Sequence, residues 1–341
     1  MTDQPLRMVG APGSPYSRKL RAVLRYRRIR HVWLTRGSPE CRELPRPRVE
    51  LLPQLVLDGP DGKPEARTDT TPLIRELERR YPGRSVVPDD PVVAFLDALV
   101  EDYADEWLTK CMFHYRWAYP ADVDKAARIL PRWFGTNQPE ETAVAMGKQF
   151  AERQIERLWV VGSNETTGPV IEASYRRLLQ LLDAHLTPWR FVMGARPGTA
   201  DFGLYGQLTQ LVAFDPTPAA IALAEAPRLV AWVDLVEELS GLEPAEDGWF
   251  ARDDVPGTFR ALLAEIGRVY VPFLLANAEA LARSAERVEC EIDGLPWVQR
   301  PFPYQAKCLT WLREAHAALE ESDREAVDSI LAGTGCGRLF A

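Results

Sequence analysis

The sequence has few cysteines and histidines, and those present are not spaced as metal ligands or as a redox pair. Its five cysteines are scattered and form no Cys-x-x-Cys motif, which argues against a disulfide framework and a zinc site. Its four histidines also lack metal-ligand spacing, so we predict no metal site. Unpaired thiols of this kind are typical of a reducing compartment.

Long apolar runs are missing as well. No run of about 18 apolar residues occurs, so we expect no transmembrane helix and no membrane partner. The first residues, 1–4, are polar, and no hydrophobic segment with a cleavage site follows them. We therefore expect no secretory signal peptide and predict a cytoplasmic protein.

Charge is unevenly divided along the chain. Residues 1–84 contain 18 Lys or Arg and 10 Asp or Glu, whereas the remainder contains 23 and 39. A basic N-terminal domain joined to an acidic one is the simplest account. A cluster in the basic part would suit nucleic acid: Arg25, Arg27, Arg28 and Arg30. Because no recognition motif or aromatic interleaving accompanies it, we interpret it as a solvated helix face and expect no nucleic-acid partner.

Apolar periodicity predicts alternating strands and helices in the first part of the chain. Strands are expected at 6–11, 31–35, 51–57 and 63–68, and helices at 15–28 and 70–81. Turn signals at Asp58-Gly59 and Asp61-Gly62 make the last two strands a hairpin. This order predicts a compact α/β domain of the thioredoxin type over residues 5–83.

After a proline-containing linker at 84–92, strand signals largely disappear. Helices are expected at 93–117, 123–134, 138–161, 168–187, 200–214, 218–224, 227–240 and 256–285. We predict an all-α domain over 93–245 and a C-terminal extension over 246–341 packed on it. In the extension, Asp293-Gly294 indicates a β-hairpin, and a final helix is expected from about Tyr304 to Glu321.

The segment Ser14-Pro15-Tyr16-Ser17 follows the first strand and opens the first helix. A helix N-terminus offers free N–H groups and a positive dipole end, which suit an anion such as a thiolate. Thioredoxins have Cys-Pro-Tyr-Cys here, and the two serines of this chain exclude dithiol chemistry. Serine is also among the best N-cap residues, so a purely structural role for Ser14 stays open.

Two further segments accompany it at matching spacing. They are Leu52-Pro53-Gln54-Leu55 at the start of a strand and Asp69-Thr70 at the start of a helix. With the helical part that contains Gly198-Thr199-Ala200-Asp201-Phe202, the chain resembles the glutathione S-transferase superfamily over about residues 5–245. The resemblance implies a thioredoxin-like glutathione-binding domain, an all-helical second domain and a homodimer.

The resemblance also implies how glutathione would be held. The backbone of Leu52, before a cis Pro53, would pair with the cysteinyl backbone of glutathione like an added strand. Thr70 would receive the γ-glutamyl carboxylate at a helix N-terminus, and Asp69 would face the ammonium. The family usually has Glu or Gln followed by Ser here, so Asp69 is a shortened acid. Lys63, or an arginine within 36–48, is the candidate for the glycyl carboxylate.

In serine-type members a hydroxyl at the helix start donates a hydrogen bond to the glutathione sulfur. The resemblance assigns this role to Ser14, with Ser17 and then Tyr16 as alternatives. It places the second substrate, an apolar electrophile, against the first long helices of the second domain. The aromatic wall expected there is formed by Tyr103, Trp107, His114 and Tyr115. A packed aromatic core is an equally good interpretation of these four residues.

Asp201 is expected to be structural. The family carries a Ser/Thr-x-x-Asp capping box at this helix start, whereas this chain has Gly198 at the cap position. Half of the box is therefore missing, and Thr199 is a candidate to compensate by a shift of one residue.

The predicted function is that of a glutathione S-transferase. It would bind reduced glutathione as co-substrate and add its thiolate to a small apolar electrophile. A non-catalytic glutathione-binding or protein-interaction member of the same fold is the main alternative. A glutathione-dependent isomerase or dehalogenase is a third. A disulfide reductase of the cysteine type is disfavoured, because positions 14 and 17 carry no thiol.

Overall fold

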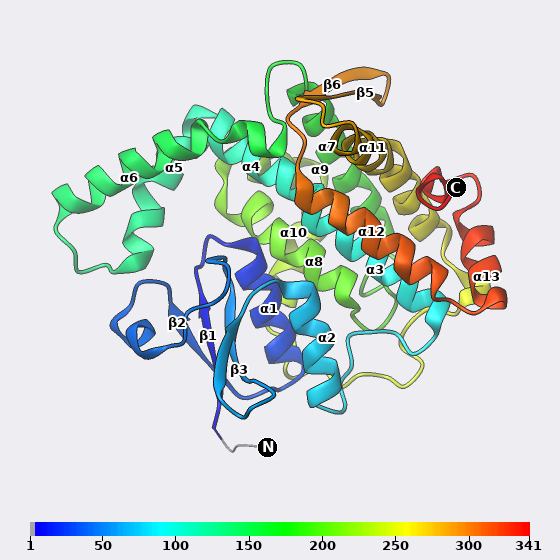
Figure 1. The fold of residues 1–341 in the computed structure, drawn as a ribbon, viewed down its shortest axis with the longest axis horizontal. Helices are drawn as coiled ribbons and strands as arrows, with labels where there is room; N and C mark the ends of the chain where they lie inside the picture. The colour runs from blue at the N-terminus through cyan, green and yellow to red at the C-terminus, as the bar shows by residue number, and fades with distance from the viewer. Residues whose placement is uncertain (1–3) are drawn as a thin grey trace.

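The computed structural model describes residues 4–341, so residues 1–3 of the polar start lie outside the described residues. A small mixed sheet with its helices comes first, and a larger group of helices follows (Figure 1). This is the predicted combination of a thioredoxin-like α/β unit with an all-α part. None of the described helices is both long and apolar enough to cross a membrane.

The N-terminal unit follows the predicted order. Its elements are β1 (Leu6–Gly10), α1 (Pro15–Tyr26), β2 (His31–Thr35), the 3-10 turn η1 (Pro39–Glu43), β3 (Gln54–Asp58), β4 (Pro64–Arg67) and α2 (Thr70–Arg80). The sheet order is β2-β1-β3-β4, with β1 parallel to β2 and the other pairs antiparallel. Met8 lies opposite Leu55 in this sheet, and both are fully buried in one core with Leu20 and Val23 of α1.

Helices dominate the rest of the described chain. They are α3 (Pro91–Glu106), α4 (Leu108–Ala118), α5 (Pro120–Ile129), α6 (Glu140–Ile155), α7 (Gly168–His185), α8 (Thr199–Leu208), α9 (Pro216–Glu225), α10 (Pro227–Val236), α11 (Gly257–Ala282), α12 (Pro303–Ala317) and α13 (Glu321–Leu331). Short turns of other helix types are η2 (Leu130–Phe134), η3 (Leu158–Val161), η4 (Thr209–Phe214), η5 (Arg252–Asp254) and η6 (Cys336–Leu339).

Several of the helix predictions were wrong in detail. The helices expected at 123–134, 138–161 and 200–214 end early, at Ile129, Ile155 and Leu208, and short turns of other helix types follow them. The helix expected at 93–117 is divided at Trp107, which keeps right-handed helical dihedral angles, so the break is local. The last expected helix ends at Ala317, and α13 follows it without having been predicted. The buried residues of α13 are only Val327, Ile330 and Leu331, which is too short an apolar stripe to stand out in the sequence.

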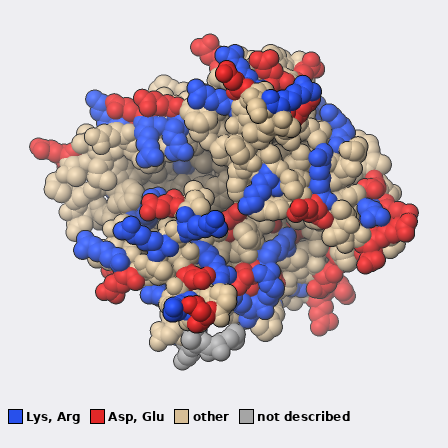
Figure 2. Space-filling view, in the orientation of Figure 1, with Lys and Arg blue, Asp and Glu red and all other residues tan. Residues whose placement is uncertain are grey.

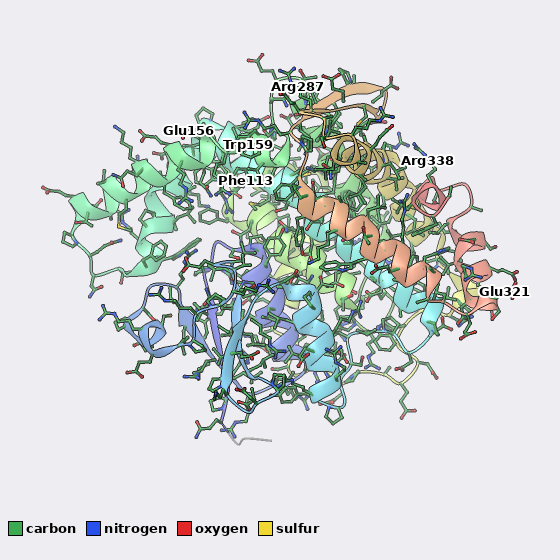
Figure 3. The ribbon with its side chains drawn as sticks, in the orientation of Figure 1. Phe113, Glu156, Trp159, Arg287, Glu321 and Arg338 are labelled. Carbon is green, nitrogen blue, oxygen red and sulfur yellow. The ribbon has the colours of Figure 1, made fainter. Side chains whose placement is uncertain are left out.

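The predicted hairpin of the extension is confirmed. β5 (Val288–Ile292) pairs with β6 (Leu295–Gln299) in antiparallel register, with Ile292 opposite Leu295. Asp293 and Gly294 both have positive φ, at 55° and 73°. A two-residue turn of this type needs positive φ at both positions, which is why Asp-Gly favours it. Figure 3 shows Glu321 and Arg338 of the last segments at the end of the molecule opposite α5 and α6.

The start of α8 is capped in an unpredicted way. Asp201 accepts a hydrogen bond from the N–H of Gly198 at 2.9 Å, which is the expected half of the capping box. The missing half comes from Asp97 of α3, whose carboxylate accepts from the N–H groups of Thr199 and Ala200 at 3.1 and 2.8 Å. The hydroxyl of Thr199 also donates to Asp97, at 2.6 Å. An acid 102 positions away in sequence therefore replaces the cap hydroxyl.

The predicted solvated face holds for only part of the arginine cluster, because Arg28 and Arg30 are exposed whereas Arg27 is buried and Arg25 is half-buried. Glu237, at the end of α10, pairs with three arginines of α1, namely Arg18, Arg21 and Arg25. Arg28 pairs with Glu243. The basic helix therefore packs against acidic residues of the helical part, and Figure 2 shows both signs of charge interspersed over the viewed face. Part of the charge asymmetry of the sequence is thus paired between the two parts of the chain.

Candidate functional site

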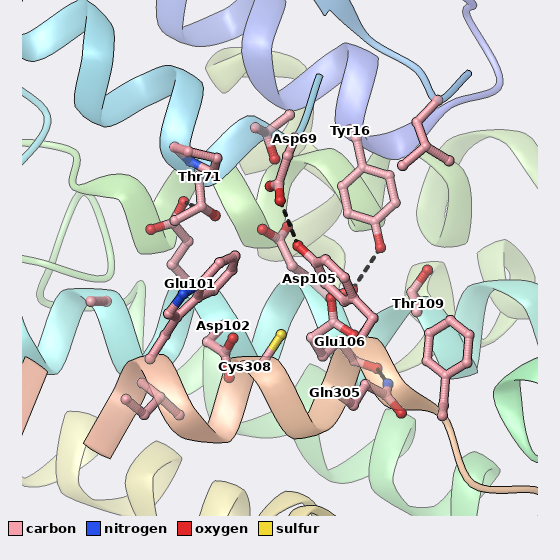
Figure 4. Close-up of a pocket in the computed structure, with 18 of the residues that line it drawn as sticks. Tyr16, Asp69, Thr71, Glu101, Asp102, Asp105, Glu106, Thr109, Gln305 and Cys308 are labelled. Carbon is pink, nitrogen blue, oxygen red and sulfur yellow. Dashed lines mark hydrogen bonds between the residues drawn. The ribbon is translucent and has the colours of Figure 1, made fainter. Parts of the chain in front are cut away.

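A cavity of about 590 Å³ lies between the N-terminal unit and the helices. Its walls come from the starts of α1 and α2, the segment before β3, one face of α3 and α4, η3, and α12 (Figure 4). The residues that line it are Tyr16, Leu51, Leu52, Asp69–Pro72, Arg75, Ala98, Glu101, Asp102, Asp105, Glu106, Thr109, Phe113, Arg157, Val160, Val161, Phe302, Tyr304, Gln305, Cys308, Trp311, Leu312 and Ala315.

The N-terminal unit brings several of its predicted residues to this cavity. The Leu52–Pro53 peptide bond is cis, as expected, and Leu52 lines the cavity just before β3 begins. Thr70, the first residue of α2, is buried and lines it too. The free N–H groups of this helix start therefore lie at the cavity wall, where an anion can be received.

Asp69 is held by a residue far away in the sequence. It precedes α2 with φ at 77° and makes no side-chain cap for that helix. Instead its Oδ2 accepts a hydrogen bond of 2.8 Å from the hydroxyl of Tyr304, at the start of α12. The sequence offered no signal for this contact, because Tyr304 belongs to the C-terminal extension, which lies outside residues 5–245 that resemble the family.

The three hydroxyl groups at the start of α1 differ in position: two make structural hydrogen bonds, and one belongs to a residue that lines the cavity. Ser14 is the N-cap, and its Oγ accepts from the N–H of Ser17 at 3.3 Å. Oγ of Ser17 is fully buried and accepts from the N–H of Ala11 at 3.3 Å. Tyr16 lines the cavity and donates to the backbone oxygen of Asp105 at 2.8 Å. The structural interpretation of Ser14 thus holds, while its role toward a sulfur stays a prediction.

Lys63 is not brought to the cavity. It lies in the turn between β3 and β4, at the opposite end of β3 from Pro53. Its side chain is 81% exposed and pairs with Asp61. Arg75, on the second turn of α2, is the cation of this unit that lines the cavity, and its guanidinium lies 3.7 Å from Glu101. The choice of Lys63 was wrong because the hairpin directs its turn away from the helix starts.

The expected aromatic wall is core, which corrects the acceptor-site prediction. Tyr103, Trp107 and Tyr115 are fully buried, and His114 is nearly so. Trp107 donates to Oγ of Ser174 and packs on Phe273 and Trp297, while His114 is held between Ser163 and Glu172. The sequence identified an aromatic face correctly but not which neighbours cover it. Here α7, α11 and the hairpin cover it, so the opposite face of α3 meets the cavity.

That opposite face of α3 is acidic. It presents Glu101, Asp102, Asp105 and Glu106 to the cavity. The spacing places all four on one side of a helix, which the sequence displayed but which sequence reasoning missed. Lys19 of α1 reaches two of them, bonding Glu101 at 2.7 Å and Asp105 at 2.5 Å, with its side chain 1% exposed.

Burial sets the protonation of this acidic face. Burial alone would lower the pKa of Lys19, but Asp105 and Glu101 beside it raise that pKa overall, so the lysine stays charged. Burial raises the pKa of Asp102 to about 7 and that of Asp105 to about 6. Burial, with the charges of Asp102 and Asp105, raises the pKa of Glu106 to about 8. Acids with such pKa values near neutrality are typical of functional sites.

The extension supplies the remaining wall. On α12, Tyr304, Cys308, Trp311 and Leu312 line the cavity at helical spacing. Burial raises the pKa of the Cys308 thiol, so it is a packing thiol rather than a nucleophile. The extension therefore covers the helical part through α11 and the hairpin, and it covers the cavity through α12.

Two family models match the chain. The model described as glutathione S-transferase, N-terminal domain, matches residues 8–85, and that described as glutathione S-transferase, C-terminal domain, matches residues 149–235. The first match spans the sheet unit, and the second runs from within α6 to α10. No curated protein matches the chain in sequence.

Solved structures of low identity are also similar. A glutathione transferase from Pseudomonas putida, with one glutathione disulfide bound per subunit, is 14% identical over 70% of this chain and 93% of its own, with a TM-score of 0.42. A glutathione S-transferase from Rhodospirillum rubrum F11 is 16% identical over 76% and 91%, with a TM-score of 0.40. A Tau class enzyme from mango is 19% identical over 74% and 94%, with a TM-score of 0.37. On the two matching family models and the fold described above, the chain belongs to the glutathione S-transferase superfamily.

Proposed function

We propose that the protein is a cytoplasmic glutathione transferase that binds reduced glutathione in the interdomain cavity and transfers its thiolate to a second substrate. One observation carries the proposal. Leu52 before the cis Pro53, Asp69 with Thr70 at the start of α2, and Tyr16 in the first turn of α1 line a single cavity. Three separated segments of the chain thus meet at one cavity, which supports glutathione as its ligand.

Each group has a chemical task in this proposal. The backbone of Leu52 precedes β3 at the end of the sheet and offers an edge for the cysteinyl backbone of glutathione. The start of α2 receives the γ-glutamyl carboxylate, and Asp69 receives the ammonium. The start of α1 stabilises the thiolate through its dipole and through the hydroxyl of Ser14. That hydroxyl already accepts from Ser17, and it retains its own hydrogen to donate to sulfur.

A calorimetric titration with reduced glutathione tests the proposal. Wild-type protein is expected to bind saturably, and the variant Asp69→Ala, Thr70→Ala to bind at least tenfold more weakly. Lys63→Ala is the matched control, because Lys63 is exposed at the far end of β3, and it is expected to bind like wild type. No binding of glutathione by the wild type at millimolar concentration would contradict the proposal.

Turnover is tested separately from binding. A panel of electrophiles with reduced glutathione would be followed by loss of free thiol. Binding without turnover across chemically distinct electrophiles would favour the non-catalytic alternative. The proposal also includes a homodimer, as the family resemblance implies, and light scattering of the purified chain would measure the mass that decides it.

A further inference from the structure

The wall between α3 and α12 carries buried hydrogen-bond acceptors that no group of residues 4–341 satisfies. Oδ1 of Asp105 and Oε1 of Gln305 have no hydrogen-bond partner. Both residues line the cavity, and they are 7% and 2% exposed. Unsatisfied buried acceptors are uncommon in folded proteins, because desolvation without a partner is unfavourable. Two of them in one cavity wall point to a ligand that brings hydrogen-bond donors.

The orientation of each group is fixed by its other contacts. Nε2 of Gln305 donates to the backbone oxygen of Glu106 at 3.3 Å, so the amide oxygen is the atom left without a partner. Oδ2 of Asp105 is bound by Lys19, which leaves Oδ1. Both free atoms are acceptors, and the wall offers them beside the carboxylate of Glu106 (Figure 4).

The charges around this wall do not balance. Of the cations near the acidic face, Lys19 and Arg75 are taken up by Glu101 and Asp105. Arg157 lines the cavity just before η3 and donates to Gln154, and the ammonium of Lys307 lies 4.1 Å from the ring centroid of Trp311. Within residues 4–341, no Lys or Arg lies within ion-pairing distance of Glu106. Lys110 influences Glu106 from α4, but its ammonium donates to the backbone oxygen of Val161 and to Gln299. Glu106 therefore faces the cavity without a cation of its own, and burial raises its pKa to about 8, so a ligand cation beside it would favour its ionised form.

The rest of this part of the cavity is apolar. Phe113 lies at the end near η3, and Trp311 and Leu312 of α12 line the wall beside the acids. Such a surface suits a flat or aliphatic body, and the acidic positions beside it suit a positive charge. The cavity thus combines the features that bind an amphipathic cation.

We propose that the second substrate carries a protonated amine on an apolar body, with its N–H donors directed at Asp105, Glu106 and Gln305. The inference rests on the proposed function, since it specifies the second substrate of the same cavity. It adds a protonated amine to the apolar electrophile that the family resemblance implied, and the electrophilic centre attacked by glutathione stays on the apolar body. The amine supplies the missing donors and the missing positive charge in one group.

The test compares two probes that differ in one group, 4-phenylbutylamine and 4-phenylbutan-1-ol. Calorimetry at about pH 8.5 keeps the amine protonated and ionises Glu106, whose pKa burial raises to about 8. The wild type is expected to bind the amine at least about tenfold more tightly than the alcohol, as for a charge-assisted hydrogen bond. Equal affinity for the two probes would overturn the proposal.

Variants locate the effect. Glu106→Gln keeps the shape and removes the charge, and Gln305→Met removes the free acceptor. Each is expected to lower the preference for the amine to below about threefold, whereas Glu289→Gln, an exposed acid on β5, is expected to leave it unchanged. Circular dichroism verifies folding of each variant. A preference that survives both Glu106→Gln and Gln305→Met in folded protein would contradict the assignment.

A last titration separates this inference from the proposed function. Glutathione is titrated with and without saturating amine, and its affinity is expected to change by less than about threefold, because the two ligands occupy different parts of the cavity. Competitive displacement of glutathione would overturn the assignment to the second substrate. Glutathione binding without amine preference refutes this inference alone, whereas amine preference without glutathione binding refutes the proposed function.

Discussion

The hydroxyl of Tyr304 donates a hydrogen bond of 2.8 Å to Oδ2 of Asp69, across a separation of 235 residues in sequence. Asp69 is the residue proposed to receive the ammonium of glutathione, and Tyr304 lies in the first turn of α12, which lines the cavity. The C-terminal extension is thus bonded to the candidate glutathione site. A donor from within the protein already occupies one oxygen of the acid that the ligand would use.

Removing that donor is predicted to tighten glutathione binding. In Tyr304→Phe the full charge of Asp69 becomes available to the ammonium, so the dissociation constant should fall by about two- to tenfold, the range of one net hydrogen bond. Tyr81→Phe, at the opposite end of α2, is the matched control and should bind like wild type. Calorimetry measures both. Weaker binding by Tyr304→Phe would mean that the tyrosine orients Asp69 instead of competing for it.

Local patterns predicted the N-terminal unit well, because its strands and helices are short, regular and separated by turn residues such as Asp58-Gly59. The hairpin at Asp293-Gly294 was predicted for the same reason: a two-residue turn is a local requirement on φ. The α13 helix was missed because its apolar stripe is short. Structure that is set by neighbouring residues in the sequence could be predicted, whereas contacts with residues far away in the sequence could not.

The site illustrates the same limit. The positions of Leu52 and Thr70 followed from family motifs, and both line the cavity. The aromatic positions Tyr103 and Trp107 were assigned to the wrong side, since spacing defines a helix face but not its neighbour. The contacts of Tyr304 with Asp69 and of Lys19 with Asp105 join segments far apart in sequence, and no single-sequence pattern encodes them.

Ser14 is predicted to have two separable effects. Ser14→Ala removes the N-cap of α1 and should lower the free energy of unfolding by about 0.5–2 kcal/mol. If the hydroxyl also donates to glutathione, the pKa of the bound thiol should rise by about one to two units. Urea denaturation measures the first effect, and ultraviolet absorbance of the thiolate against pH measures the second. Ser17→Ala, which loses only the bond from Ala11, should leave the thiol pKa unchanged. If Ser14→Ala changes neither the pKa of the bound thiol nor the turnover, then Ser14 serves only as the N-cap of α1.

Lys19 is predicted to stabilise the contact between the N-terminal unit and the helical part. Lys19→Met leaves Glu101 and Asp105 buried without their cation, which should destabilise the fold by about 3–5 kcal/mol. Adding Glu101→Gln and Asp105→Asn should restore most of the loss, because no buried charge then lacks a partner. Urea denaturation of the single and triple variants measures this. A triple variant as unstable as the single one would show that packing of the lysine stem, not charge, is responsible.

Stability is predicted to fall as the pH rises from about 5 to 8. Burial raises the folded-state pKa of Asp97 and Asp102 to about 7, and burial raises that of Glu106 to about 8. The unfolded chain releases these protons near pH 4, while the folded protein still holds them, so the unfolded state is favoured increasingly until the folded pKa is passed. Glu106→Gln should remove up to about 1.4 kcal/mol per pH unit of this slope. Urea denaturation across the range gives the slopes, and Glu289→Gln should match the wild type.

The cap of α8 gives a prediction opposite to that from sequence alone. The capping-box pattern predicts that Gly198→Ser supplies the missing hydroxyl and stabilises the helix start. In the structure, a Cβ at Gly198 would overlap Oδ1 of Asp97 and Cγ of Met193. Oδ1 of Asp97 already accepts from the N–H of Ala200, and Oδ2 accepts from the N–H of Thr199. Gly198→Ser is therefore expected to destabilise the protein by about 1–3 kcal/mol, as overpacking of a buried contact does.

A double-mutant cycle identifies the cause of that loss. Asp97→Ala alone should destabilise strongly, because it leaves buried N–H groups at the start of α8 without acceptors. In the Asp97→Ala background the overlap with Asp97 is gone and the serine hydroxyl has donors to accept from, while Cγ of Met193 still lies 2.7 Å from the added Cβ. Gly198→Ser should therefore destabilise much less than it does in the wild type. Thermal and urea unfolding of the four proteins measure the coupling. If Gly198→Ser changes the free energy of unfolding equally with and without Asp97, then Asp97 does not cap the start of α8.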